Sequence, residues 1–236
     1  MQFRPLRQRN GFVLVLALTL GLRSLSGCAG SCSHSEIRWV RSSTEYQVTA
    51  REVYRMATVH VREAAGRTGA PWGVVLDADE TILDNSAYQL QLAGSGQSYP
   101  QGWDAWIMKE AAPVVPGAKE FLTAVRNAGG KIIVVTNRLE TQCRATHAHF
   151  NKLELPFDLI WCKPDKDDGK AARFRLVQAQ GVTLETGGHV SSIVAWVGDS
   201  IADFPSLGET GPTDTTSLAR FGVDYFMIPN PMYGPW

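Results

Sequence analysis

The sequence has 236 residues, of which 44% are hydrophobic and 19% are charged, which is typical of a soluble globular protein. Lysine and arginine together number 23, and so do aspartate and glutamate. Residues 1–27 hold four of the arginines and no acid, so the remaining chain carries 19 basic and 23 acidic residues. This mildly acidic balance argues against nucleic-acid polymers as partners, and the length predicts one compact domain with an insertion.

The first residues have the pattern of a targeting segment. Arg4, Arg7 and Arg9 precede an apolar stretch at 11–22 that is too short to span a bilayer comfortably as a mature helix. We therefore interpret residues 1–27 as a secretory signal peptide.

The sequence LSGC at 25–28 resembles the lipobox of bacterial lipoproteins, in which the cysteine is lipidated and becomes the new N-terminus. The resemblance implies a lipid anchor on Cys28, and a chance cysteine after an ordinary signal is the alternative. Ala29 is not the aspartate that retains some lipoproteins in the inner membrane. The expected location is therefore the outer membrane, with the protein facing either the periplasm or the cell surface.

Residues 31–41 are small, polar and aperiodic, so residues 28–41 are interpreted as the lipidated N-terminus and a tether, and residues 42–236 as the folded domain. Ser42 and Glu45 have the spacing of a capping box. A helix is predicted from there to about Ala65, with an apolar face formed by Tyr46, Val53, Tyr54, Met56 and Val59.

Further along, apolar β-rich runs alternate with helical patterns. The predicted strands are 72–76, 131–135, 157–161, 193–197 and 225–228, and the predicted helices are 117–128, 139–152 and 169–180. Such alternation predicts an α/β fold, a Rossmann-like parallel sheet with helices on both faces and a ligand crevice at the C-terminal ends of the strands. The stretch 87–116 is expected to form a small cap inserted after the first strand.

Polar side chains follow these strands, and in such a sheet they should share one site. They are Asp77 and Asp79, Thr136 to Arg138, the lysine-containing stretch 163–170, and Asp199 and Asp203. Carboxylates suit Mg²⁺, which prefers oxygen ligands, and an ammonium and a hydroxyl can hold phosphoryl oxygens. The set predicts chemistry on a phosphoryl group beside a hard cation.

Four short motifs of the sequence resemble those of a known family. DADET at 77–81, Thr136, Lys170 and GDSIAD at 198–203 match, in order, the four motifs of the haloacid dehalogenase superfamily of aspartate-nucleophile phosphatases. DADETILDNSAY, WDAW, VPGAKEF, VTNR, KAARF, VGDSIADF and the terminal PNPMYGPW resemble the class C, lipoprotein-type bacterial acid phosphatases over roughly residues 45–236. A single DxDxT is weak evidence, whereas the ordered set together with a lipobox is specific.

The resemblance assigns the catalytic roles to the first motif. Asp77 would be the nucleophile that forms an aspartyl-phosphate and would also bind Mg²⁺. Asp79 would protonate the leaving oxygen, then activate water, and its backbone carbonyl would contact the metal. Ala78 departs from the branched aliphatic residue of the relatives, which affects packing more than chemistry.

The resemblance likewise assigns the remaining ligands. Asp199 would complete the metal shell, and Asp203 would bind the metal directly or through water. Thr136 and Lys170 would bind phosphate. The lysine spacing departs from the family pattern, because Lys166 lies four residues before Lys170 instead of three. Lys170 is preferred because it keeps its distance to Arg173, and Lys166 is the second choice.

Aromatic residues suggest how the organic part of a substrate is bound. The resemblance implies that Trp103 and Trp106 of the insertion, with Tyr233 near the C-terminus, form a flat slot for 5′-nucleotides or nicotinamide mononucleotide. The alternative is that both tryptophans belong to the core. A lipoprotein that binds a nucleotide or cofactor without turnover is a second functional hypothesis, and another chemistry of the superfamily, dehalogenation or mutase transfer, is a third.

Three further features have simpler interpretations. Cys143 and Cys162 could form a disulfide or remain buried thiols. His147 and His149 are expected to lie on the surface, because no acidic partner is evident. Glu80 is interpreted as a structural acid near the site.

Overall fold

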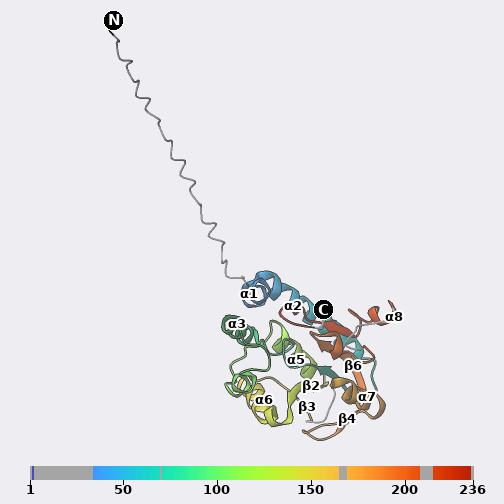
Figure 1. The fold of residues 1–236 in the computed structure, drawn as a ribbon. Coiled ribbons are helices and arrows are strands. Elements are labelled where there is room, and N and C mark those ends of the chain that lie inside the picture. The colour runs from blue at the N-terminus through green and yellow to red at the C-terminus, as the bar shows by residue number, and fades with distance from the viewer. Residues whose placement is uncertain (1, 3–33, 70, 165–168, 208–214, 235–236) are drawn as a thin grey trace. The chain divides into compact units, whose positions relative to one another are not determined.

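The computed structural model describes residues 2, 34–69, 71–164, 169–207 and 215–234, and residues 34–236 form one unit (Figure 1). The predicted signal peptide, Cys28 and Lys166 lie outside the described residues. Among the described residues, no helix has the length and apolar character required to cross a membrane.

Five parallel strands form the central sheet, in the order β3-β2-β1-β6-β7. Their bounds are β1 Trp72–Leu76, β2 Lys131–Leu139, β3 Leu159–Lys163, β6 Ser192–Gly198 and β7 Tyr225–Met227. A separate antiparallel pair consists of β4 (Val182–Thr183) and β5 (His189–Val190), and neither was predicted. The predicted α/β class with a parallel sheet is confirmed.

Helices connect the strands, and their bounds are α1 Ser35–Ser42, α2 Thr44–Ala65, α3 Ser86–Ser95, α4 Trp103–Met108, α5 Ala118–Asn127, α6 Glu140–Lys152, α7 Lys170–Gln180 and α8 Thr215–Leu218. A short 3-10 helix, η1, spans Ile201–Asp203. α3 and α4 lie in the insertion between β1 and α5.

The sheet is buried on both faces because alternate side chains of each strand enter different clusters. Val74 and Leu76 of β1 pack in a core cluster with residues of α2, α5 and α6. Val75, between them, packs in a second cluster with Phe174 and Val177 of α7. Each fully buried side chain of this kind contributes roughly 1.5–3 kcal/mol. Because both faces of β1 are covered, every residue of the strand is buried. The acids that follow β1 therefore begin at a buried strand end.

The expected tether is wrong for residues 35–41, which form helix α1. Ile37 and Val40 are buried, and the ring of Trp39 contacts that of Tyr46 with centroids 5.3 Å apart. Three apolar residues within four positions of a short, otherwise polar stretch are a weak helical pattern, which is why the sequence did not reveal the helix.

The start of α2 is shifted by one residue from the prediction, and its buried face is different. Ser43, not Ser42, caps the helix, accepting a hydrogen bond at 3.0 Å from the amide of Tyr46. Met56 and Val59 are 50% and 56% exposed, whereas small residues occupy much of the buried face. That face consists of Tyr46, Ala50, Tyr54, Ala57, Val61 and Ala64.

Cys143 on α6 and Cys162 on β3 form a disulfide, which decides between the two alternatives left open by the sequence.

The histidine assignment is wrong in two respects. His149 is only 2% exposed, and the ring of His147 contacts the carboxylate of Glu185 at 3.0 Å.

Candidate active site

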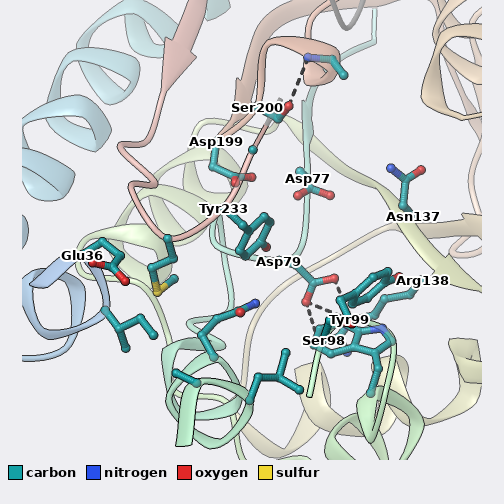
Figure 2. Close-up of a pocket in the computed structure, with 18 of the residues that line it drawn as sticks. Glu36, Asp77, Asp79, Ser98, Tyr99, Asn137, Arg138, Asp199, Ser200 and Tyr233 are labelled. Atoms are coloured by element: carbon teal, nitrogen blue, oxygen red, sulfur yellow. Dashed lines mark hydrogen bonds and ion pairs between the residues drawn. The ribbon is translucent and has the colours of Figure 1, made fainter. Parts of the chain in front are cut away.

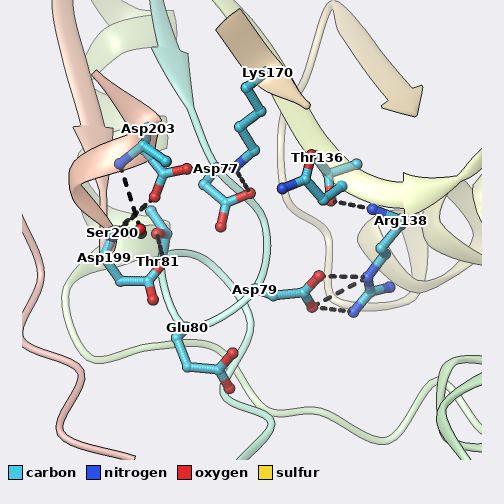
Figure 3. A network of polar contacts seen from close by, with 12 residues as sticks. Asp77, Asp79, Glu80, Thr81, Thr136, Arg138, Lys170, Asp199, Ser200 and Asp203 are labelled. Carbon is cyan, nitrogen blue, oxygen red and sulfur yellow. Dashed lines mark hydrogen bonds and ion pairs between the residues drawn. The ribbon is translucent and has the colours of Figure 1, made fainter. Parts of the chain in front are cut away.

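Asp77 continues the hydrogen bonding of β1, its amide donating to the carbonyl of Val197 at 3.0 Å. The chain then turns sharply, with the amides of Ile82 and Leu83 donating to the carbonyl of Ala78 and with Glu80 at a φ of 56°. Figure 3 shows that the turn leaves both Asp77 and Asp79 beside the ends of the neighbouring strands. The strand end thus positions the two carboxylates, as the sequence predicted.

Lys170, the first residue of α7, directs its side chain toward Asp77 at this strand end. Its ammonium group binds the carboxylate of Asp77, and it binds Oδ1 of Asp203 at 2.6 Å. All three side chains are buried, with exposures of 8% or less. The one ammonium group therefore neutralises part of a larger negative charge.

The acidic loop after β6 is shaped by Asp203. Its Oδ2 accepts hydrogen bonds from the amides of Asp199 and Ser200 at 3.2 and 2.9 Å, which folds the loop back on itself. Gly198 is required here, because an added Cβ would lie 2.2 Å from the Cβ of Asp203. The carboxylate of Asp199 accepts from Thr81 Oγ1 at 3.1 Å and from Asn230 Nδ2 at 2.8 Å.

Asp77, Asp199 and Asp203 fit a divalent metal ion. Each offers one carboxylate oxygen, and these oxygens all lie within 4.8 Å of one another. Burial raises the pKa of Asp77 to about 7, although Lys170 acts in the opposite direction. Burial, and next the charges of Asp203 and Asp77, also raise the pKa of Asp199 well above its ordinary value. Ionising the cluster is thus costly, and a hard cation with oxygen ligands would offset that cost.

Asp79 lies apart from this cluster, against Arg138 (Figure 3). The guanidinium binds both carboxylate oxygens, and Asn85 Nδ2 donates to Oδ1 at 2.8 Å. Asn85 is in turn fixed by the indole N–H of Trp106 at 2.8 Å. The sequence pattern placed Arg138 among the polar residues expected to share the site but assigned no individual role to it, and it did not single out Asn85. In the structure Arg138 lies within β2.

Thr136 and Trp106 are both buried, and neither is among the described residues that line the main cavity. Thr136 Oγ1 accepts a hydrogen bond from the amide of Arg138 at 3.1 Å, so in this structure it supports the strand end. Trp106 is 9% exposed, and its indole N–H donates to Asn85, which in turn donates to Asp79 at the cavity wall. The structure therefore does not bring these two predicted residues to the cavity wall.

The remaining predicted residues surround one cavity of about 690 Å³ (Figure 2). Asp77, Asp79, Asp199, Asp203, Lys170, Trp103 and Tyr233 all line it. Trp103 is 8% exposed and packs against Tyr88 and Tyr99, with ring centroids 5.0 and 5.9 Å away. Tyr99 and Tyr233 are 64% and 41% exposed, so these two rings are open to a ligand.

Glu80 lies beneath this cavity and does more than the sequence interpretation assigned to it. Its carboxylate accepts hydrogen bonds from the amide of Asn85 at 2.9 Å and from the hydroxyl of Tyr233. Burial, and then the charge of Asp79, raise the pKa of Glu80 to about 8. Glu80 therefore links the C-terminal tyrosine to the turn that carries Asp79.

Comparisons with known proteins agree with this geometry. Residues 28–236 match the family model of the HAD superfamily, subfamily IIIB (acid phosphatase). The class C acid phosphatase from Bacillus anthracis is similar in structure, with a TM-score of 0.74 and 30% identity over 86% of this chain and 85% of that chain. A structure of the class C acid phosphatase from the same organism with tungstate bound gives a TM-score of 0.71 and 28% identity over 87% and 88%. With its acids gathered at the strand ends of the matching fold, this chain belongs to the class C acid phosphatases of the haloacid dehalogenase superfamily and is a phosphomonoesterase.

Proposed function

We propose that the enzyme hydrolyses phosphomonoesters with Mg²⁺ through an aspartyl-phosphate on Asp77, and that its substrates are 5′-nucleotides or nicotinamide mononucleotide. The observation that carries the proposal is the position of Asp77, which shares the acidic cluster with Asp199 and Asp203 and lines the same cavity as Asp79. The tungstate-bound relative supports it, because tungstate is a tetrahedral oxyanion like phosphate.

In the first half-reaction, a carboxylate oxygen of Asp77 attacks phosphorus while the bond from phosphorus to the leaving oxygen breaks. Asp79 gives its proton to that leaving oxygen. Lys170 stays close enough to the nucleophile to interact with phosphoryl oxygens. Asp77, Asp199 and Asp203 would hold Mg²⁺, with the backbone carbonyl of Asp79, and the ion would neutralise the charge that the carboxylate and the phosphoryl group bring together.

In the second half-reaction, Asp79 takes a proton from water, and the water oxygen attacks phosphorus. The bond between phosphorus and Asp77 breaks, which releases inorganic phosphate and restores the carboxylate. Arg138 and Asn85 hold Asp79 at the cavity wall throughout.

The test is phosphate release by the full-length protein from 5′-nucleotides, nicotinamide mononucleotide, sugar phosphates and an aryl phosphate. We expect release that is lost on chelation, restored by Mg²⁺ and fastest with the aromatic substrates. Asp77→Asn should fold normally and lose about 10⁴-fold or more in kcat, the scale of removing a covalent nucleophile. No release from any substrate by folded, metal-loaded protein would instead support the alternative, a lipoprotein that binds a nucleotide or cofactor without turnover.

We also propose that Cys28 carries a lipid that anchors the enzyme to the outer membrane, facing the periplasm or the cell surface. The support is the LSGC sequence after an arginine-flanked apolar stretch. Metabolic labelling with a radioactive fatty acid should mark the wild type but not Cys28→Ser, and the wild type should fractionate with outer membranes. Equal labelling of both proteins would disprove the assignment.

A further inference from the structure

The cavity is much larger than a phosphoryl group, and helix α1 closes one end of it. Its volume, about 690 Å³, falls in the range of small-molecule sites, roughly 300–1,000 Å³. His34, Glu36 and Ile37, from the start of α1, line it together with Leu92 of α3 and Met232. Figure 2 shows Glu36 on α1, on the other side of Tyr233 from Asp79. The segment that the sequence assigned to a tether therefore forms a wall of the active site.

Helix α1 is held firmly enough to define this wall. Ile37 and Val40 are each 5% exposed, and Trp39 contacts Tyr46 of α2. α1 packs against both α2 and α3. The carboxylate of Glu36 thus projects from a docked helix, and its side chain remains 35% exposed.

The charges that line the cavity are unevenly distributed. Among the described lining residues, the only lysine and arginine are Lys170 and Arg138, and both already bind carboxylates at the catalytic end. At the α1 end, the one ion pair of Glu36 within the part of the chain that the structure describes is with His34 Nδ1, at 3.4 Å. The backbone amide of Glu36 lowers the pKa of its carboxyl, so the group is ionised in the neutral range.

We propose that Glu36 is a specificity-determining residue whose carboxylate favours phosphomonoesters with a positively charged leaving group. The proposal rests on the proposed phosphomonoesterase function of the same cavity. With the phosphoryl group at Asp77, a leaving group that passes Tyr233 extends toward Glu36, where a cation gains an attraction that a neutral group does not.

The experiment compares two substrates that differ in ring charge, the cationic nicotinamide mononucleotide and its neutral reduced form. The ratio of their kcat/KM values is measured at about pH 8, where an ordinary histidine is neutral, for wild type, Glu36→Gln and Glu45→Gln. Glu45 is a matched control, because it is an exposed acid of α2 that does not line the cavity. Thermal melting verifies that each variant is folded.

In Glu36→Gln the ratio of kcat/KM for the cationic substrate to kcat/KM for the neutral substrate should fall about threefold to fivefold, as expected for the loss of a partly exposed ion pair. Glu45→Gln should keep the wild-type ratio, and the effect of Glu36→Gln should shrink at about 1 M salt, where charges are screened within roughly 3 Å. An unchanged ratio, or an equal loss for both substrates, would overturn this inference alone. A wild type that hydrolyses neither substrate but releases phosphate from a 5′-nucleotide or an aryl phosphate would also overturn this inference alone, whereas one that hydrolyses none of them would overturn the proposed function as well.

Discussion

Arg138 grips the carboxylate of Asp79 through three hydrogen bonds, Nε donating to both oxygens at 3.1 Å and Nη2 donating to Oδ1 at 2.7 Å. The Arg138 side chain is 1% exposed, and its Nη1 also donates to Thr146 Oγ1 at 3.2 Å. A buried, planar guanidinium that is itself fixed leaves the carboxylate little freedom. Arg138 is therefore a positioning residue for the proposed acid and base.

Arg138→Lys should reduce kcat while changing KM little. Lysine keeps the positive charge but cannot make the forked contact, so Asp79 loses its orientation, and we expect a decrease of about 10-fold to 10²-fold. Steady-state kinetics with an aryl phosphate measures this. Arg220→Lys is the control, because Arg220 pairs with Asp224 and neither residue lines the cavity. A wild-type kcat in Arg138→Lys would refute the positioning role.

Mg²⁺ should stabilise the wild-type fold, because it offsets the charge of the three clustered acids. At about 100 times its dissociation constant a ligand adds about 2.7 kcal/mol, which corresponds to a rise in Tm of roughly 5–10 °C for a chain of this size. Asp199→Asn should show a much smaller rise. Without metal, Asp199→Asn should melt at or above wild type, because burial disfavours the ionised carboxylate that it replaces.

Thermal melting with and without Mg²⁺ measures these shifts independently of activity. Asp224→Asn, outside the acidic cluster, serves as the control and should respond as wild type does. An equal Mg²⁺ shift in Asp199→Asn and wild type would count against Asp199 as a ligand.

The sheet and the acidic cluster could be predicted because both follow from short-range patterns. β1 is a run of apolar residues that ends at Asp77, and parallel strands bring their C-terminal ends to one edge. The position of Lys170 at the start of α7 follows from the same rule. The family resemblance adds chemical roles to positions that the alternation of strands and helices had already brought together.

Other parts of the site depend on tertiary contacts that leave little trace in a local pattern. Arg138 is buried in an ion pair with Asp79. A charged residue adds nothing to an apolar periodicity, so the sequence pattern does not indicate its burial. Trp106 has the helical spacing of a cavity aromatic, but its indole N–H is directed at Asn85. Helix α1 exists through its packing on α2 and α3, which only the folded chain provides.

Tyr233→Ala should raise KM for 5′-nucleotides by about fivefold or more, because stacking of a base on an aromatic ring contributes roughly 1–3 kcal/mol. The ring is 41% exposed and lines the cavity, so it is available to a base. A small aryl phosphate should be affected much less. Tyr233→Phe is the matched control, since it keeps the ring and removes only the hydrogen bond to Glu80. Equal increases in KM for both substrates would remove the argument for a stacking slot.

His149 should make folding stability fall as the pH falls. Burial lowers the pKa of His149 from its ordinary value of 6.5, the charges of Arg138 and Lys152 act in the same direction, and the backbone of Ala112 and the charge of Glu110 oppose them. Within the described chain, Nε2 is buried without a hydrogen-bond partner. The unfolded chain therefore binds the proton more readily, so this contribution is complete above pH 6.5 and is lost progressively below it.

His149→Asn should lose less stability than wild type between about pH 8 and about pH 5, by up to about 1.4 kcal/mol per pH unit below the ordinary histidine pKa. Denaturant unfolding at a series of pH values measures the slope. His189→Asn, at an exposed position on β5, should keep the wild-type slope. The same slope in His149→Asn and wild type would contradict the prediction.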